Sequence, residues 1–298
     1  MSGRVLITGA GGLIGRQTIA PLKDQGFHVV ALGRAATYQG ADDVIQCDLL
    51  DDSARKAGVA EADCSHLVHL AWHDEPANRW TAPQNVDWAA ATLSLVREFA
   101  AAGGTRVVAA GSCAEYDWSF QELREDTPLA PSTLYGHAKA TTGAFLTSAA
   151  GDLGLSLCWA RIFFCYGPNE PKGRLLGDLI HGLSRGEIIE TTDGLQERDF
   201  LHTADIGRAL AMLAQSDITG PVNVSSGQAT KVRDLVLTAA KLAGREDLVR
   251  LGARARPGHD PECLVGPNER LQSIGFRAQI GLQDGLAACL GEMAQGDD

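Results

Sequence analysis

The sequence predicts an α/β fold: a doubly wound parallel sheet with helices on both faces, joined to a smaller, discontinuous C-terminal domain. Two observations support this prediction. Short, almost continuously apolar runs alternate with helical stretches along the first 160 residues, and such runs are typical of parallel strands buried on both faces. The first run, residues 4–8, ends in glycines directly before a helical segment.

Each element follows from the spacing of its apolar residues. Runs of four to eight apolar residues indicate strands, and apolar positions three or four apart indicate helices. Strands are expected at residues 4–8, 27–32, 44–47, 66–70, 106–110, 155–162 and 222–224, and helices at residues 13–25, 53–60, 83–102, 132–150 and 203–215.

Beyond Ile162 the pattern changes to segments punctuated by glycine and proline, with shorter helices expected at residues 175–184, 231–243 and 283–293. Because a strand at 222–224 would return to the sheet, this second part is expected to be inserted discontinuously. The predicted sheet domain comprises residues 1–163 and about 200–226. The predicted second domain, a substrate-binding cap, comprises residues 164–199 and 227–298.

Composition restricts the class of protein. The 298 residues carry 26 Lys and Arg against 37 Asp and Glu, a net charge of -11, with 45% hydrophobic residues. Such a chain is expected to fold completely, and its acidic balance argues against nucleic acid or an anionic membrane as the main partner. The sequence shows neither a membrane-length apolar run nor a signal arrangement, which predicts a cytoplasmic protein. The seven cysteines form no C-x-x-C pair, and we expect buried thiols.

The turn after the first strand has the spacing of a dinucleotide-binding loop. Glycines at positions 9, 12 and 15 would allow a tight turn, backbone contact with a pyrophosphate and close packing of the next helix, as in a Rossmann-type fold. An ordinary glycine-rich turn is the alternative. The residues expected to contact the cofactor are Gly9, Gly12, Leu13, Ile14, Gly15, Arg34, Asp48, Leu49, Leu70, Ala71, Trp72, Tyr135 and Lys139.

Arg34 bears on the choice of cofactor. It follows the second strand, where an acidic residue would hold a ribose 2′-hydroxyl, so the sequence favours NADP over NAD. A solvated loop arginine is the alternative. Asp48 has two interpretations, one near the adenine and one as the cap of the helix at 53–60.

Tyr135 and Lys139 lie four residues apart on one predicted helix and therefore share a face. The phenol ionises near pH ~10, too high for proton transfer, and an adjacent lysine with a cationic nicotinamide is expected to lower that pKa. Ser112, after the strand at 106–110, can hydrogen-bond the same substrate oxygen.

Together, the glycine loop and the Tyr-x-x-x-Lys motif resemble the extended short-chain dehydrogenase/reductase family along nearly the whole chain. The segments 111–116, 161–168, 198–205 and 223–227 match it as well. The resemblance implies a catalytic triad of Ser112, Tyr135 and Lys139, with Tyr135 as proton donor or acceptor. Family members that eliminate water carry an Asp-Glu pair where this chain has Cys113 and Ala114, which argues against a 4,6-dehydratase.

The family resemblance also suggests substrate contacts. Arg198 resembles an arginine that binds the substrate diphosphate, with a structural ion pair as the alternative, and Arg256 lies where relatives place a second phosphate-binding arginine. His73, Cys113 and Asn169 are the other expected substrate contacts. Phe164 stands where many members have a substrate-binding asparagine. One usual substrate contact is therefore absent, and the sequence does not identify the substrate.

Two further expectations concern metals and assembly. His66 and His69 lie three apart on a strand and face opposite sides, so no metal site is predicted. The alanine-rich helix at 89–102 resembles the helix through which family members form homodimers.

The leading functional hypothesis is an NADPH-dependent keto reductase acting on a small-molecule substrate, a nucleotide-linked deoxysugar. An NAD-dependent nucleotide-sugar 4-epimerase is the second hypothesis. A non-catalytic, dinucleotide-binding regulator is the third, and the intact Ser112, Tyr135 and Lys139 argue against it.

Overall fold

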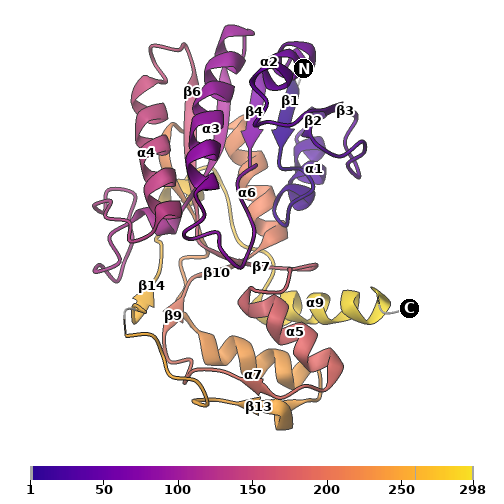
Figure 1. Ribbon diagram of the computed structural model, residues 1–298, viewed down its shortest axis with the longest axis vertical. Helices are drawn as coiled ribbons and strands as arrows, with labels where there is room; N and C mark the ends of the chain where they lie inside the picture. Colours follow the sequence, from indigo (N-terminus) through magenta and orange to yellow (C-terminus); the bar gives the residue numbers. More distant parts are fainter. Residues whose placement is uncertain (1–2, 259, 297–298) are drawn as a thin grey trace.

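The computed structural model describes residues 3–258 and 260–296. Its centre is a seven-stranded sheet (Figure 1) in the order β11-β6-β5-β4-β1-β2-β3, with every neighbouring pair parallel. The strands of this sheet are β1 (Arg4–Thr8), β2 (His28–Gly33), β3 (Asp43–Gln46), β4 (His66–His69), β5 (Arg106–Ser112), β6 (Ser156–Ile162) and β11 (Gly220–Val224).

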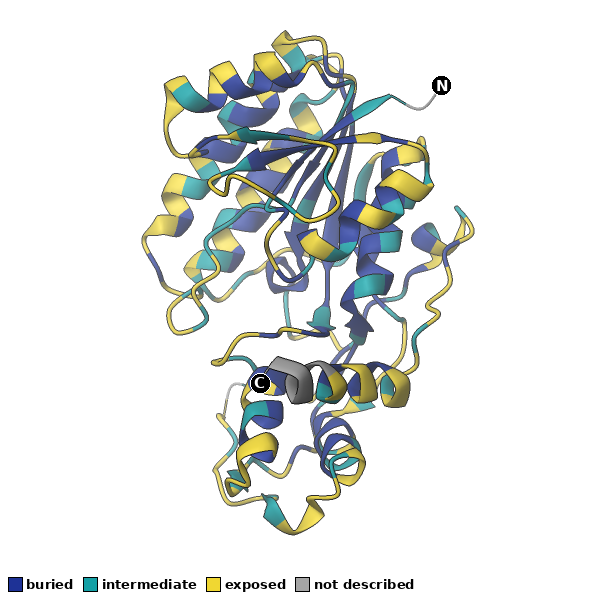
Figure 2. Ribbon diagram, turned by 90° about the vertical axis from the view of Figure 1, so that its right-hand side faces the viewer, coloured by how far each residue is buried: buried dark blue, intermediate teal, exposed yellow. Residues whose placement is uncertain are grey.

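Helices cover both faces of the sheet, so the predicted fold class is confirmed. On β1, Val5 and Ile7 pack into the cluster formed with α1 (Gly15–Asp24) and α6 (Thr203–Gln215). Leu6, between them, points to the other face, as the two-residue period of a strand requires. The helices on that other face are α2 (Asp52–Ala62), α3 (Gln84–Ala101) and α4 (Leu134–Ala149). Figure 2 shows the strands buried between these layers.

The strand order reverses between β1 and β4, because β2 lies on one side of β1 and β4 on the other. In open parallel sheets, ligands bind outside the carboxyl ends of the strands at such a reversal. The glycine-rich turn after β1 and the segment after β4 both lie there. The fold therefore brings the two predicted cofactor-binding segments to the same place.

Asp48 does not cap α2, so that interpretation of Asp48 is wrong. The N-cap of α2 is Asp51, whose carboxylate accepts a hydrogen bond from the Ala54 backbone N–H at 2.9 Å. Asp48 lies on the surface and accepts from the Leu50 N–H at 3.1 Å in a local turn. The helix begins four residues after Asp48, beyond the reach of a capping side chain.

The second part of the chain lies below the sheet in Figure 1 and has its own apolar cluster. Its helices are α5 (Leu175–Arg185), α7 (Val232–Leu242) and α9 (Leu282–Gly296). The short helix α8 (Glu269–Gln272) instead packs against β11, with Leu271 in the apolar cluster of the sheet. Its short strands are β7 (Phe164–Tyr166), β8 (Ile189–Glu190), β9 (Glu197–Arg198), β10 (Phe200–His202), β12 (Thr230–Lys231), β13 (Val249–Arg250) and β14 (Cys263–Leu264). Three-residue 3-10 turns, η1 (Cys113–Glu115) and η2 (Glu246–Leu248), complete the elements.

The path of the chain crosses between the two parts more than once. It leaves the sheet after β6, returns for α6 and β11, and leaves again, as the predicted strand at 222–224 required. The predicted domain boundaries near 163, 199 and 226 fall between β6 and β7, between β9 and β10, and after β11. These boundaries stay a prediction.

Cys47, Cys64, Cys113, Cys158 and Cys289 are buried, as predicted, whereas Cys165 and Cys263 are partly exposed. No helix within the described residues has both the length and the apolar character needed to cross a membrane.

Candidate active site

A cavity of about 860 Å³ lies where the carboxyl edge of the sheet meets the second part of the chain. This volume is in the range of small-molecule and cofactor sites. The predicted site residues that line it are Gly9, Gly12, Leu13, Ile14, Gly15, Leu70, Trp72, His73, Ser112, Cys113, Tyr135, Lys139 and Arg198. Those that do not line it are Arg34, Asp48, Leu49, Ala71, Asn169 and Arg256.

The glycine-rich turn fits the phosphates of a dinucleotide. Gly9 has a φ of 71°, and a Cβ there would lie 2.7 Å from the Ala71 nitrogen. A Cβ on Gly15 would lie 2.0 Å from the Gly9 carbonyl oxygen. Because side chains are excluded at both positions, bare backbone lines the cavity at the start of α1, where N–H groups favour an anion.

Four of the predicted cofactor residues lie outside this cavity. The Arg34 side chain is exposed, and its carbonyl accepts a hydrogen bond from Gln46 Nε2 at 2.9 Å. Leu49 is buried against the α2 and α3 face. Ala71 contributes backbone, donating from its N–H to Thr8 Oγ1 at 3.3 Å. Asp48 is the fourth, on the surface as described above.

Lys139 is held on α4 one turn beyond Tyr135. Its Nζ donates to the Ala110 carbonyl at 2.8 Å and lies 3.7 Å from the ring centroid of Trp72. Burial lowers the pKa of Lys139 to about 7, because an ammonium is poorly solvated there. When Lys139 is protonated, the hydrogen bond to the Ala110 carbonyl and the cation–π contact with the Trp72 ring stabilise its charge.

Tyr135 shows the largest difference from the sequence-based expectation for the catalytic residues. Burial raises the pKa of its phenol to about 12, and a hydrogen bond with Ser112 lowers that pKa only in part. The lowering expected from Lys139 together with a cationic nicotinamide is not present in the protein alone, because Lys139 is itself buried and loses its proton near neutral pH; for the cofactor complex it stays a prediction. Additional positive charge must enter the site to favour the phenolate.

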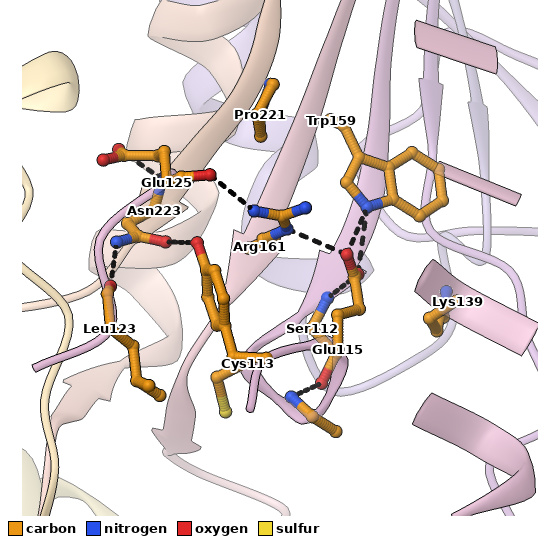
Figure 3. A network of polar contacts seen from close by, with 12 residues as sticks. Ser112, Cys113, Glu115, Leu123, Glu125, Lys139, Trp159, Arg161, Pro221 and Asn223 are labelled. Atoms are coloured by element: carbon orange, nitrogen blue, oxygen red, sulfur yellow. Dashed lines mark hydrogen bonds and ion pairs between the residues drawn. The ribbon is translucent and has the colours of Figure 1, made fainter. Parts of the chain in front are cut away.

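A buried network holds the backbone of Ser112 at the end of β5 (Figure 3). The Ser112 N–H donates to Glu115 Oε1 at 2.7 Å, and the Ala114 N–H donates to Ser112 Oγ at 3.2 Å. The Glu115 carboxylate is fully buried, where it accepts from Trp159 Nε1 at 2.9 Å and pairs with Arg161 at 2.8 Å. Every oxygen of this carboxylate is thus hydrogen-bonded, which a buried charge requires.

The same network continues toward β11. Arg161 Nη1 donates to the Glu125 carbonyl at 3.1 Å. The Tyr116 hydroxyl donates to Asn223 Oδ1 at 2.6 Å, and Asn223 Nδ2 donates to the Leu123 carbonyl at 2.7 Å. Tyr116, Arg161 and Asn223 entered the sequence-based predictions only as parts of family-like segments, and their role was missed.

Cys113 and Ala114 occupy the positions where dehydratases carry an acid and a base. Burial raises the pKa of the Cys113 thiol to about 12, so the thiol stays protonated at neutral pH. Ala114 offers no ionisable group. Phe164 packs against Phe200 at a ring-centroid distance of 6.0 Å and adds an apolar wall.

Arg198 and Arg256 both pair with Asp260. Arg198 Nη2 pairs with Asp260 Oδ1, and Arg256 Nε lies 3.3 Å from Asp260 Oδ2. Arg256 also pairs with Glu262 at 3.0 Å. The structure therefore gives Arg198 an ion pair at the wall of the cavity, with Asp260 as the partner, while Arg256 stands behind Asp260 outside the cavity.

The other predicted substrate contacts lie apart. His73 Nε2 is 2.9 Å from Asn78 Oδ1 at the rim. Asn169 has a φ of 61° and lines a second cavity of about 270 Å³ beside α5.

His69 and His66 face opposite sides of β4, as predicted. His69 is buried between the hydroxyls of Thr8 and Thr92 at 2.7 and 2.9 Å, and burial lowers its pKa to about 3. His66 packs on Phe27. Over residues 3–258 and 260–296, no group of three or more His, Cys, Asp or Glu side chains could hold a metal ion.

A model of the NAD dependent epimerase/dehydratase family matches residues 5–225. The chain belongs to this family. Its curated relatives include a UDP-glucose 4-epimerase of Azospirillum brasilense, 27% identical over 321 residues and covering 96% of this chain and 90% of the relative. A dTDP-glucose 4,6-dehydratase of Streptomyces griseus is 26% identical over 314 residues, covering 97% and 93%.

Among solved structures, MoeE5 in complex with UDP-glucuronic acid and NAD is 31% identical, with a TM-score of 0.84 and coverage of 99% of this chain and 100% of that chain. The same protein has been solved with UDP-glucose and NAD. These relatives confirm the resemblance to extended short-chain dehydrogenases/reductases. The protein is therefore an NAD(P)-dependent enzyme of that type, and the hypothesis of a non-catalytic regulator is wrong.

Proposed function

We propose that the protein is an NAD-dependent nucleotide-sugar 4-epimerase and that its substrate is a uridine diphosphate sugar. The proposal rests on one observation: Ser112, Tyr135 and Lys139 line the same cavity as the glycine-rich turn. Support comes from relatives with 4-epimerase activity that align along most of the chain, and from MoeE5, which binds UDP sugars and NAD.

The chain's own residues supply the proton transfers. Tyr135 removes the proton of the sugar 4-hydroxyl, and Ser112 hydrogen-bonds the same oxygen as C4 becomes a ketone. After the keto sugar presents its other face, Tyr135 returns a proton to that oxygen with inverted configuration at C4. Arg79 places positive charge near the phenol and lowers its pKa, which favours this role.

The glycine-rich turn at residues 9–15 would hold the pyrophosphate of NAD, with Leu70 and Trp72 along the cavity wall beside it. When bound, NAD would accept a hydride from C4 in the oxidation and return it in the reduction, and it would bring positive charge into the cavity. Lys139 stays bonded to the Ala110 carbonyl beside this site.

The epimerase is favoured over the keto reductase that led the sequence-based hypotheses. That hypothesis depended on Arg34 as a 2′-phosphate ligand, yet Arg34 is exposed and outside the cavity. The 31% identical MoeE5 binds NAD, so NAD replaces NADP in this proposal. A 4,6-dehydratase is disfavoured because Cys113 and Ala114 provide neither base nor acid.

The test begins with the dinucleotide that copurifies with the protein. Denatured protein should release close to one NAD per chain, identified by chromatography and mass. Without added dinucleotide, the enzyme should convert UDP-glucose or UDP-glucuronic acid into its 4-epimer. An empty protein that oxidises NADPH in the presence of keto sugar nucleotides would instead identify a reductase.

A homodimer through α3 and α4 is the second part of this proposal. The alanine-rich α3 resembles the helix through which family members form homodimers, and α3 and α4 carry exposed apolar side chains, with Val86 58% and Phe145 59% exposed. Light scattering should give twice the chain mass, and Phe145→Asp should reduce it to one chain. A monomeric wild-type protein would contradict this assignment.

A further inference from the structure

Two arginines from distant segments meet at the Tyr135 end of the cavity. Arg79 lies in the loop between β4 and α3, and Arg174 is the residue before α5. Both line the cavity, together with Glu170 and Asp74. This pair is separate from Arg198, the arginine of β9 that also lines the cavity.

The position of Arg79 relative to the reacting phenol is fixed by Trp80. The Arg79 guanidinium lies 4.9 Å from the ring centroid of Trp80. That ring stands edge-on to Tyr135 at 5.5 Å, and the Tyr135 N–H donates to the Trp80 carbonyl at 3.1 Å. Arg79 also lowers the pKa of Tyr135 through its charge, so a group bound by Arg79 would lie near the Tyr135 phenol.

Both guanidiniums face one carboxylate oxygen without hydrogen-bonding it. Asp74 Oδ1 is 3.8 Å from Arg79 Nη1 and 3.9 Å from Arg174 Nη1, and both distances exceed a hydrogen bond. The Asp74 side chain is 53% exposed. Among the described residues, the Arg79 guanidinium donates no hydrogen bond, so its donors are available to a ligand.

Arg174 is oriented by its other contacts. Its Nε donates to Glu170 Oε1 at 2.9 Å, and its Nη2 donates to the Cys165 thiol at 3.0 Å. These bonds fix the guanidinium with Nη1 toward Asp74. The forked geometry of an arginine suits a carboxylate ligand.

Charged groups of both signs line this part of the cavity. Arg79, Arg174 and the exposed Lys172 supply positive charge, against Asp74, Glu170 and Asp178. Glu170 is buried and pairs with Arg174, and burial raises its pKa. Because Glu170 is already paired with Arg174, Arg79 is the cation that an incoming anion can meet first.

We propose that Arg79 and Arg174 bind a carboxylate on the sugar, so that the preferred substrate is a nucleotide-linked hexuronic acid and Asp74 is displaced when it binds. This inference rests on the proposed function and extends it to the substrate class. In a hexuronic acid the carboxylate is attached to C5, next to C4. With the C4 oxygen at Tyr135, the carboxylate can reach the oxygen position that Asp74 marks.

The first test compares kcat/KM for UDP-glucuronic acid and UDP-glucose in the purified holoenzyme. The wild-type protein should prefer UDP-glucuronic acid by at least about tenfold, since a charged hydrogen-bonded contact is lost with the hydroxymethyl sugar. Arg174→Gln should lower kcat/KM for UDP-glucuronic acid by about 10- to 100-fold and for UDP-glucose by less than about threefold. Arg79→Gln also removes positive charge near the phenol, so it should lower kcat/KM for both substrates and more strongly for UDP-glucuronic acid. Equal losses for both substrates in Arg174→Gln would overturn the inference.

Arg185→Gln is the matched control. It removes the same charge from the exposed C-terminal end of α5, outside the cavity, and should change neither value. An equal loss of uronate preference in this variant would also overturn the inference, since a general charge effect would then explain it.

Asp74→Asn tests the inference in the opposite direction and changes an exposed side chain, so folding should be preserved. Removing the competing carboxylate should raise kcat/KM for UDP-glucuronic acid by about three- to tenfold, with UDP-glucose nearly unchanged. A fall in uronate activity would show that Asp74 is needed for binding and would contradict its displacement.

Two measurements distinguish failure of this inference from failure of the proposed function. If the wild-type protein converts UDP-glucose and not UDP-glucuronic acid, the inference fails and the epimerase stands. If it converts neither, calorimetric Kd values still decide the inference: Arg79→Gln should weaken binding of UDP-glucuronic acid alone. Loss of copurified NAD from the arginine variants would assign the pair to the cofactor and overturn the inference.

Discussion

The cavity holds its functional groups in two different ways. On the sheet side, Lys139 is bound to a backbone carbonyl, and Ser112 is fixed by the buried Glu115. The cationic groups of the cavity face carboxylates: Arg198 pairs with Asp260, while Arg79, in the loop after β4, and Arg174, before α5, face Asp74. The groups proposed to react are therefore preorganised, whereas in our proposal the cationic groups exchange a protein carboxylate for a ligand anion.

The largest expected effect is the loss of turnover when a reacting group on the sheet side is removed. Tyr135→Phe removes the hydroxyl that transfers the proton and should lower turnover by at least about 10³-fold, within the range of general acid-base catalysis. Because the ring and its contact with Trp80 remain, copurified NAD should be unchanged. Turnover and released NAD are measured on the same preparation. Turnover close to wild type would remove Tyr135 from the reaction.

Glu115→Gln tests whether the buried network supports the sheet side. The substitution leaves Arg161 charged and without its carboxylate, which should cost about 3–5 kcal/mol of unfolding free energy in urea titrations. Glu122→Gln is the control, since Glu122 pairs with Arg124 at the exposed surface and should cost at most about 1 kcal/mol. Similar losses in the two variants would show that the buried network contributes little.

The burial of His69 allows a prediction of how the free energy of unfolding depends on pH. Its pKa is about 3 in the folded protein, against about 6.5 when unfolded. Between these values the unfolded chain binds more protons, so stability should fall as pH falls from 6.5 toward 3.

The loss assigned to His69 should reach roughly 3 kcal/mol by about pH 4. His69→Gln should flatten this dependence in urea titrations across that range, while His137→Gln on the exposed side of α4 should leave it unchanged. An unchanged slope in the His69 variant would contradict the account.

The smallest expected effect concerns Arg34. Because its side chain is exposed and outside the cavity, Arg34→Ala should change NAD affinity by less than about twofold in calorimetry on protein reconstituted with the cofactor. A large and selective loss of NADPH binding would restore the original interpretation of Arg34 and weaken the choice of NAD.

Local sequence patterns were enough to predict the glycine-rich turn and the shared helix face of Tyr135 and Lys139. The glycines at 9, 12 and 15 and the four-residue spacing of Tyr135 and Lys139 each depend on a single turn or helix face. The buried network was missed because Glu115 and Arg161 lie 46 residues apart in sequence and meet only across β5 and β6. The burial of Tyr135, which opposes the phenolate, could not be seen from spacing.

Among the cationic groups of the cavity and its surroundings, the sequence pointed to Arg198 and Arg256, but Asp260 between them was missed. Arg79, whose partner Arg174 comes from a separate segment, was also missed. Residue type identifies a cation, and the fold decides which carboxylate it meets. This is why the catalytic groups were easier to predict than the substrate.

The most direct test of the central claim follows the hydrogen on C4. UDP-glucose or UDP-glucuronic acid deuterated at C4 is incubated with the enzyme and no added dinucleotide, and the product is examined by NMR. The account predicts inversion at C4 with the deuterium retained there, because the oxidation is reversed within the same closed site. Inversion with loss of deuterium to solvent, or no inversion at all, would contradict it.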